Sequence, residues 1–306
     1  MSLRIAVLGR GAWGGTLIRL WERQGHRLTS WSRRDGGNPA AVLLDSDLVV
    51  VAVSMVGVAP LATQLQGHWP EGLPLLSCSK GIDLDTLCTA TQLWRRHLPA
   101  VPLAVLSGPN LADELERGLP AASVLSSRDH DLARHLQGRL RAPHFRLYTN
   151  ADPIGTEVAG ALKNVIALAA GISDGLGLGA NAKASLLCRG LSEIAVVLQA
   201  LGGQTATLYG LAGLGDLLAT ANSPLSRNYR FGLLLAEGCD ESTALGRIGA
   251  TVEGTRTARA SLALADREGW QLPICGQVVR LLAGQVQAQQ AVQELMQRDL
   301  RAEAAP

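Results

Sequence analysis

The sequence has almost no excess of charge of either sign and few aromatic side chains. Its 28 Lys and Arg residues nearly balance 26 Asp and Glu residues, which leaves a net charge of +2 at pH 7. Proteins that bind nucleic acids usually concentrate Lys and Arg on one face, so we expect no nucleic-acid partner. With six Trp, three Tyr and two Phe among 306 residues, the core must be largely aliphatic.

Cysteine and histidine are too scattered to predict a disulfide framework or a metal centre. The six histidines have no metal-binding or catalytic spacing, and neither G-x-S-x-G nor H-E-x-x-H occurs. The five cysteines form no C-x-x-C pair, which is typical of reduced thiols in the cytoplasm. They are Cys78, Cys88, Cys188, Cys239 and Cys275. We therefore expect no metal ion.

Long hydrophobic runs are also missing. The first 15 residues contain Arg4 and Arg10 and no apolar stretch, so they do not resemble a signal peptide. The uncharged run 48–63 is too short to span a bilayer, and the longer run 194–215 is broken by Gly202 and Gly203. The sequence predicts a cytoplasmic protein without a transmembrane segment.

The first half contains short apolar runs that alternate with helical patterns. Strands are predicted at 3–8, 47–53, 74–78 and 102–106, and helices at 13–24 and 84–97. Such alternation is typical of a doubly wound α/β sheet. The length of 306 residues fits two domains.

Helical periodicity dominates after about residue 150. Asp152 and Pro153 predict a helix start, with Asp as N-cap and Pro at the first helical position. Apolar residues recur at helical spacing from 187 to 201, and 261–269 and 276–295 are also predicted helices. We place a domain boundary near Asn150, which divides the chain into 1–150 and an all-helical 151–306.

Residues 9–14 have the pattern G-x-G-x-x-G between a predicted strand and a predicted helix. In that context Gly9 permits a tight turn, Gly11 lets a pyrophosphate approach the backbone, and Gly14 lets the helix pack against the strand. The alternative is an ordinary turn in a glycine-rich chain. The position and context favour a dinucleotide site in the domain 1–150.

The segment expected beside the adenosine ribose contains arginines in place of an acid. NAD sites usually have Asp or Glu about 20 residues beyond the glycine loop. Here the predicted strand 28–31 is followed by Ser32, Arg33 and Arg34. Because guanidinium binds phosphate through two parallel hydrogen bonds, these arginines favour NADP(H). The alternative is an exposed arginine pair on a loop.

Two lysines are candidates for chemistry. Lys80 follows a predicted strand, at the edge where open α/β sheets bind ligands, although a solvated loop lysine would look the same. Lys163 is the only charged residue between Val158 and Ala170. A desolvated lysine has a lowered pKa suited to acid–base catalysis near neutral pH. The alternative for Lys163 is a lysine with its charged end at the surface.

A polar cluster lies further along the second half. Asp216 supplies a carboxylate, and Ser226, Arg227 and Asn228 have side chains suited to a phosphate group. The alternative is that Asp216 and Ser226 cap helices, a common use of both residue types.

Together, and in this order, these motifs resemble those of the soluble, bacterial-type NAD(P)-dependent glycerol-3-phosphate dehydrogenases. The resemblance runs from residue 5 to about residue 273 and rests on residues 9–14, 80–82, 107–110, 161–164, 174–177, 213–216 and 226–228. It implies a Rossmann-like domain followed by a helical substrate-binding domain, a small phosphorylated substrate and a homodimer.

The resemblance also implies roles for individual residues. Lys163 matches the proton acceptor and donor. Substrate contacts match Lys80, Gly108, Asn110, Lys163, Asp216, Ser226, Arg227 and Asn228. Nucleotide contacts match Ala12, Trp13, Arg33, Lys80, Ala112, Arg227 and Glu253, beside the glycines of the loop and Arg34.

Three features depart from the family pattern. Asn110 stands where Ser or Thr is usual, Arg10 replaces a small residue inside the glycine loop, and the segment between Arg34 and Asp47 is short.

The expected activity is the interconversion of dihydroxyacetone phosphate and sn-glycerol 3-phosphate, in the service of glycerophospholipid synthesis. NADP(H) is the preferred cofactor and NAD(H) the second. One alternative is another β-hydroxyacid or ketopantoate-type reductase of the same fold. The other is a non-catalytic NADP-binding sensor.

Overall fold

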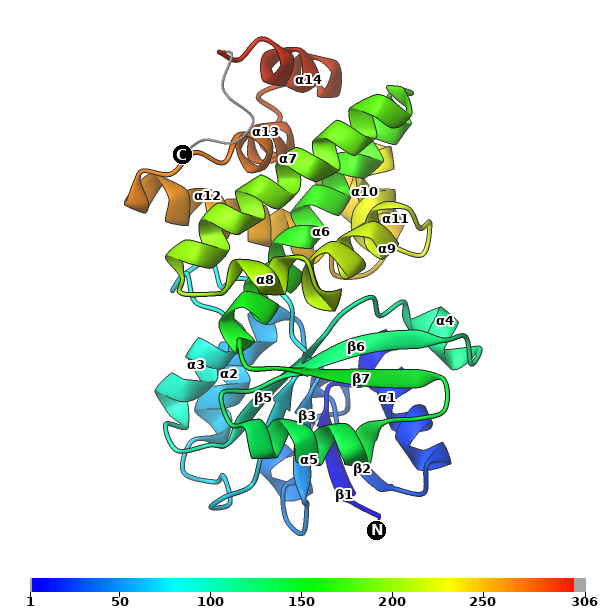
Figure 1. Cartoon of the computed structure of the whole chain (residues 1–306), viewed down its shortest axis with the longest axis vertical. Helices are drawn as coiled ribbons and strands as arrows, with labels where there is room; N and C mark the ends of the chain where they lie inside the picture. The colour runs from blue at the N-terminus through cyan, green and yellow to red at the C-terminus, as the bar shows by residue number, and fades with distance from the viewer. Residues whose placement is uncertain (1, 300–306) are drawn as a thin grey trace.

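The computed structural model describes residues 2–299, which form a seven-stranded sheet followed by a helical half (Figure 1). The strands lie in the order β2-β1-β3-β4-β5-β6-β7, and all neighbours are parallel except β5 and β6. Their bounds are β1 Arg4–Leu8, β2 Arg27–Trp31, β3 Leu48–Val51, β4 Leu75–Ser77, β5 Leu103–Ser107, β6 Ala121–Ser126 and β7 Phe145–Asn150.

Helices cover both faces of the sheet, which confirms the doubly wound α/β prediction. On one face α1 (Ala12–Arg23) and α5 (His130–Leu140) pack on an aliphatic core, and on the other α2 (Met55–Leu65) and α3 (Ala90–His97) do the same. All residues of β3 are buried, as expected for a parallel strand covered on both faces. Three short elements complete this half: η1 Arg33–Asp35, η2 Pro39–Val42 and α4 Ala112–Glu116.

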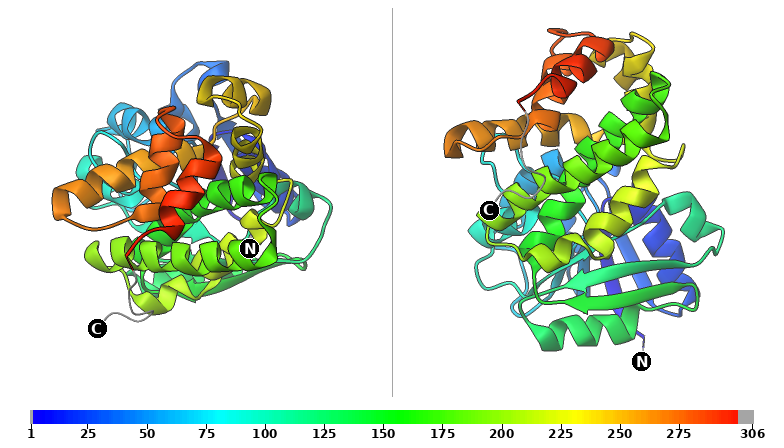
Figure 2. Two further views of the ribbon diagram at one scale, coloured as in Figure 1. Left: turned by 90° about the horizontal axis from the view of Figure 1, so that it is seen from above. Right: turned by 45° about the horizontal axis from the view of Figure 1, so that its top comes forward.

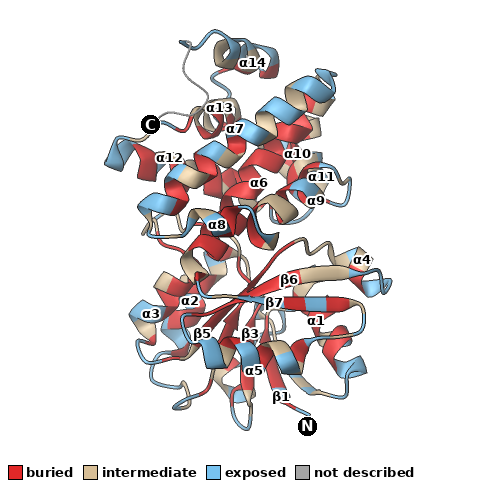
Figure 3. Ribbon diagram, in the orientation of Figure 1, coloured by how far each residue is buried: buried red, intermediate tan, exposed pale blue. Residues whose placement is uncertain are grey.

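The second half is built around one buried helix, α6 (Pro153–Gly175). Every residue from Gly155 to Ser173 is buried (Figure 3). Asp152 caps this helix by accepting a 2.8 Å hydrogen bond from the Gly155 amide, as predicted. Around α6 lie α7 Gly179–Ala200, α8 Thr205–Leu208, η3 Leu211–Gly215, α9 Asp216–Ala221, α10 Arg227–Ala236, α11 Glu241–Ile248, α12 Glu253–Glu268, α13 Pro273–Leu282 and α14 Ala288–Met296.

Glycines let α10 cross α6 at close range. A Cβ atom at Gly171 would lie 2.1 Å from the carbonyl oxygen of Tyr229, and one at Gly232 would lie 2.0 Å from that of Leu168. No side chain fits within those distances. The crossing therefore sets the first turn of α10 beside the middle of α6.

The helical half lies over the carboxyl ends of the parallel strands (Figures 1 and 2). At this edge Met55, after β3, contacts Glu253 of α12, and Lys80, after β4, contacts Asp216 of α9. Lys80 also contacts Gly108, which follows β5. In open α/β sheets this edge is where ligands bind.

The predicted helix 84–97 is wrong in its first part. The structure begins α3 at Ala90, where Thr89 and Gln92 form a capping box. Before it, the Asp83 carboxylate accepts a 2.9 Å hydrogen bond from the Thr86 amide, and Leu87 has a φ of +56°. The helical periodicity of the sequence continues through residues 84–89, but the backbone forms a turn there.

The predicted helix 276–295 is also wrong as a single element. The structure divides it into α13 and α14, because Gly284 adopts a φ of +69° between them. Conversely, β6, β7 and α5 have no counterpart among the sequence predictions. Within residues 2–299, no helix combines the length and the apolar character needed to cross a membrane.

Candidate active site

A buried carboxylate pairs with two lysines at the junction of the two halves. Asp216, only 2% exposed, begins α9, and its Oδ1 lies 2.9 Å from Nζ of Lys163 on α6. Its Oδ2 accepts a 2.6 Å hydrogen bond from Nζ of Lys80, which follows β4. Lys80 also donates to the carbonyl oxygen of Gly108 at 3.1 Å. We call Lys80, Lys163 and Asp216 the lysine–aspartate cluster.

Thr220 joins this cluster from the next turn of α9. Lys163 Nζ donates to Thr220 Oγ1 at 2.7 Å, and that hydroxyl donates to Asp216 Oδ1 at 3.1 Å. Thr220 is not among the residues predicted from the sequence. The available signal was its spacing of four residues from Asp216, which places both on one helical face.

Burial and pairing compete for the protonation states of the cluster. Burial lowers the pKa of Lys163 to about 8, Asp216 opposes this shift, and the charge of Lys80 adds to it. Burial alone would raise the pKa of Asp216, but the two lysines hold it below its usual value. At neutral pH Asp216 is therefore a carboxylate. Lys163 is an ammonium at this pH, and its pKa of about 8 is only slightly higher.

The predicted Ser-Arg-Asn cluster lies at the first turn of α10. Ser226 caps the helix by accepting a 3.2 Å hydrogen bond from the Tyr229 amide. Asn228 donates to Oδ1 of Asn164 at 2.9 Å and accepts from the Gly254 amide at 2.9 Å, so it ties α10 to α6 and α12.

Arg227 is exposed at this turn. Burial is the main influence on the pKa values of Lys163 and Glu253, and the charge of Arg227 acts on both as a smaller effect. Its guanidinium is therefore close enough to act on the lysine–aspartate cluster and on the start of α12.

The glycine loop has the geometry that a dinucleotide requires. Gly9 has a φ of +108°, and a Cβ there would lie 2.6 Å from the carbonyl oxygen of Ala52. A Cβ at Gly14 would lie 1.9 Å from the carbonyl oxygen of Gly9. At Gly11 a Cβ would meet no protein atom within 4 Å. The open space at Gly11, at the N-terminal end of α1, suits a pyrophosphate against the backbone.

Two predicted nucleotide contacts, Ala12 and Trp13, begin α1. Ala12 is exposed, and the half-buried Trp13 ring stands edge-on to Phe145 with ring centroids 6.5 Å apart. A third, Ala112, begins α4. This helix is fastened to α1 because Glu116 accepts a 2.6 Å hydrogen bond from the Thr16 hydroxyl.

Arg33 and Arg34 lie exposed in η1, directly after β2. Neither forms an ion pair within residues 2–299. The same short helix contains Asp35, an acid that the sequence analysis did not consider, and Asp35 pairs with Arg10 of the glycine loop.

Two buried polar atoms at the same sheet edge are free to form hydrogen bonds with a bound ligand. Within the described part of the chain, Nδ2 of Asn110 and Oε2 of Glu253 have no hydrogen-bond partner. The other oxygen of Glu253 accepts from the Met55 amide at 3.3 Å, and the other end of Asn110 accepts from the Ser123 hydroxyl. Because an unpaired buried polar atom is costly, these two are suited to contacts with a bound molecule.

Comparison of the sequence with protein families gives one consistent result. The profile described as the NAD-dependent glycerol-3-phosphate dehydrogenase C-terminus matches residues 152–293, and the N-terminus profile matches residues 36–133. A curated glycerol-3-phosphate dehydrogenase (NAD(P)+) of Synechococcus sp. strain RCC307 is 55% identical, with 99% of this chain and 100% of that protein covered. Its counterpart in Trichormus variabilis is 46% identical, with 98% of each covered.

Solved structures agree with the sequence comparison. The crystal structure of glycerol-3-phosphate dehydrogenase from Coxiella burnetii matches with a TM-score of 0.92 and 35% identity, covering 97% of this chain and 99% of that one. A ketopantoate reductase from Ralstonia eutropha matches with a TM-score of 0.59 and 17% identity, covering 95% of this chain and all of that one. The second likeness concerns the fold alone.

Proposed function

Because this chain belongs to the family of NAD-dependent glycerol-3-phosphate dehydrogenases, we propose that it interconverts dihydroxyacetone phosphate and sn-glycerol 3-phosphate with NAD(P)H. The product would feed glycerophospholipid synthesis. The observation that carries the proposal is the buried lysine–aspartate cluster, which lies at the same edge of the sheet as the glycine loop.

Lys163 is the acid–base group of this proposal. When bound, a nicotinamide dinucleotide would supply or accept the hydride exchanged with C2 of the substrate. As an ammonium, Lys163 protonates the oxygen at C2 during reduction, and as a neutral amine it accepts that proton during oxidation. Asp216 and Thr220 orient the Lys163 amine through the contacts described above, which reduces the entropic cost of proton transfer.

Arg227 is the group that binds the substrate phosphate. Its guanidinium can form two parallel hydrogen bonds to phosphate oxygens, and it stands in the first turn of α10 between Ser226 and Asn228. On the other side of the substrate, Lys80 and Asn110 supply donors beside the backbone of Gly108.

The cofactor belongs to the sheet half. We assign residues 1–150 to dinucleotide binding and residues 151–306 to substrate binding. NADPH is preferred because Arg33 and Arg34 follow β2. The remaining contacts are assigned to Gly9, Gly11, Ala12, Trp13, Gly14, Lys80, Ala112, Arg227 and Glu253.

A cytoplasmic location and a homodimer complete the proposal. All five cysteines are free, which suits a reducing compartment. The homodimer is supported by the family resemblance only, and light scattering of the purified protein after gel filtration tests it.

The activity test compares two substrates and includes one variant, Lys163→Ala. Purified protein should oxidise NADPH with dihydroxyacetone phosphate and not with ketopantoate. Lys163→Ala should lower kcat by about 10²–10⁴-fold, while NADPH fluorescence on binding stays unchanged. Turnover of ketopantoate alone would establish the same-fold reductase instead. NADPH binding without turnover of any keto substrate would establish the sensor, against which the buried acid–base pair argues.

A further inference from the structure

An acidic side chain, Asp35, lies shortly after β2, where the adenosine ribose of a dinucleotide is expected to bind. Asp35 ends η1, directly after Arg33 and Arg34. The strands β1 and β2 are parallel neighbours, and the Gly9 amide donates to the Trp31 carbonyl oxygen at 2.8 Å. The glycine loop and η1 therefore leave the sheet side by side, at the edge where the ribose is expected.

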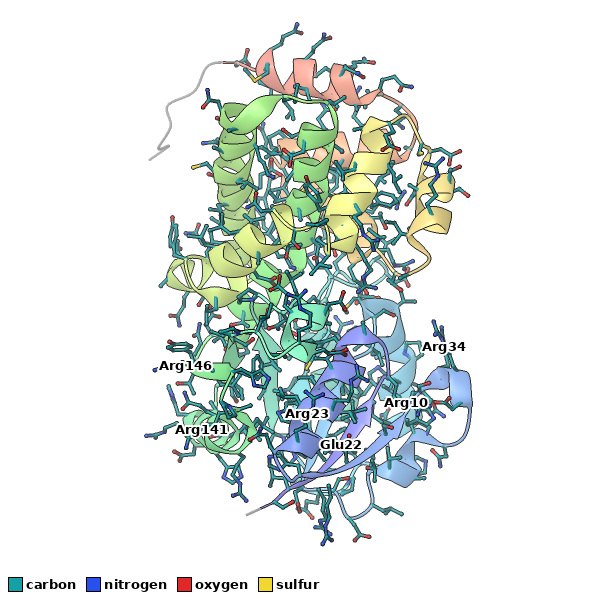
Figure 4. All side chains as sticks on the ribbon, turned by 90° about the vertical axis from the view of Figure 1, so that its right-hand side faces the viewer. Arg10, Glu22, Arg23, Arg34, Arg141 and Arg146 are labelled. Atoms are coloured by element: carbon teal, nitrogen blue, oxygen red, sulfur yellow. The ribbon has the colours of Figure 1, made fainter. Side chains whose placement is uncertain are left out.

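Arg10 of the glycine loop forms an ion pair with Asp35. Its guanidinium donates to Oδ2 of Asp35, to which the Ser32 hydroxyl also donates at 2.8 Å. The side chains of Arg10 and Asp35 are 45% and 49% exposed. Figure 4 shows Arg10 and Arg34 projecting from the same side of the sheet half.

Ser32 and then Arg10 lower the pKa of the Asp35 carboxyl through these hydrogen bonds. Asp35 is therefore charged at neutral pH. Its charge bears directly on the choice of cofactor, because a 2′-phosphate and a 2′-hydroxyl differ in how they meet a carboxylate.

An unpaired Asp35 would favour NADH over NADPH in two ways. Its negative charge would repel the 2′-phosphate, and its oxygens would accept a hydrogen bond from the 2′-hydroxyl of NADH, as the acid does in NAD-selective sites. Pairing with Arg10 offsets the charge and occupies one of the oxygens.

We infer that Arg10 determines cofactor specificity: it neutralises Asp35 and, with Arg33 and Arg34, presents a third guanidinium to the 2′-phosphate of NADP(H). The inference rests on the proposed function only in that the chain must bind a nicotinamide dinucleotide.

The test measures dissociation constants for NADPH and NADH by isothermal titration calorimetry, so that it does not depend on catalysis. Arg10→Ala should weaken NADPH binding about tenfold, the lower end expected for a charge-assisted contact, and should bind NADH at least as tightly as the wild type. The double change Arg10→Ala/Asp35→Ala should recover part of the NADPH affinity, because the repelling carboxylate is gone, and should lose any gain with NADH.

Arg4→Ala is the matched control. Arg4 stands at the opposite end of β1 and pairs with Asp47 at 2.8 Å, with a similar exposed fraction of 49%. It removes the same charge, so its ratio of NADPH to NADH affinity should equal that of the wild type. Exposed pairs of this kind contribute little to stability, and thermal unfolding of all variants verifies their folding.

Three results would overturn the inference. They are an equal effect of Arg10→Ala on both nucleotides, the same shift in Arg4→Ala, and a double variant no better with NADPH than Arg10→Ala alone. In each case both nucleotides still bind, so the proposed function stands. If the wild type binds neither nucleotide, the proposed function fails together with the inference.

Discussion

At the scale of the residue, Lys163 shows how burial and pairing together adjust one side chain. Removal from water disfavours its ammonium form, whereas Asp216 favours it. The resulting pKa of about 8 makes both protonation states accessible near neutral pH, which an exposed lysine does not achieve. Because the proposed function makes Lys163 the acid in one direction and the base in the other, the two directions should respond oppositely to pH.

We expect reduction of dihydroxyacetone phosphate to slow as the pH rises through about 8, because it needs the ammonium form of Lys163, whose pKa burial lowers to that value. Oxidation of sn-glycerol 3-phosphate needs the neutral amine and should accelerate over the same range. Measurements of kcat/KM for both directions between pH 6 and pH 10 check this, because kcat/KM reports the ionisations of the free enzyme. If the rates of both directions rise together or fall together with pH, a group other than Lys163 causes the pH dependence.

Substitutions of Arg227 distinguish the effect of its paired hydrogen bonds from the effect of its positive charge. Arg227→Ala should raise KM for dihydroxyacetone phosphate much more than Arg227→Lys does, because an ammonium keeps the charge and loses the paired hydrogen bonds. Steady-state kinetics of both variants at saturating NADPH provide the measurement. If lysine and alanine raise KM equally, Arg227 does not hold the phosphate through paired bonds.

At the scale of the element, α6 connects the site to the rest of the fold. Besides Lys163 and Asn164, it presents Glu157, which caps α3 of the other half. One carboxylate oxygen accepts from the Thr91 amide at 2.9 Å, and the other accepts from the Thr91 hydroxyl. Burial raises the pKa of Glu157 to about 7, although the bonds from Thr91 oppose the shift. The helix α6 is thus fastened to the sheet half by a titratable contact.

This contact should make stability depend on pH. Because the folded state raises the pKa of Glu157 from 4.5 to about 7, its contribution is fully present below pH 4.5 and is lost as the pH rises through 7. Relative to Glu157→Gln, which cannot ionise, the wild type should lose about 2–3 kcal/mol of unfolding free energy between pH 4.5 and pH 8. Urea unfolding at both pH values measures the difference. If the difference between the wild type and Glu157→Gln does not change with pH, folding does not raise the pKa of Glu157.

At the scale of the whole molecule, the sequence predicts the two-part fold and all three residues of the lysine–aspartate cluster, but not the contacts between distant segments. The glycine loop and the solitary charge at Lys163 are local patterns, so they are readable. The antiparallel β6 and the break at Gly284 depend on tertiary context. The role of Thr220 and the pairing of Arg10 with Asp35 appear only when segments far apart in the chain meet.

The lysine–aspartate cluster also holds the two halves together, since Lys80 comes from the sheet half and Asp216 from the helical half. Asp216→Asn would leave the buried ammonium of Lys163 and the partly exposed ammonium of Lys80 without their counter-charge. Breaking a buried ion pair in this way typically costs about 3–5 kcal/mol. We expect that loss in urea unfolding at pH 7. It should be smaller at pH 9, where Lys163 has lost its proton because its pKa is about 8 even beside Asp216.

The double variant Asp216→Asn/Lys163→Met distinguishes charge from packing. Methionine fills a volume similar to that of the lysine stem and removes one of the two unpaired charges, so it should recover more than half of the stability lost in Asp216→Asn. Lys183→Met is the control, because Lys183 pairs with Asp174 and is not part of the cluster. Combined with Asp216→Asn, it should lower the stability further and recover none of the loss. If Lys163→Met also adds a loss, the cluster is held by packing and hydrogen bonding, and its charges do not govern how the two halves stay joined.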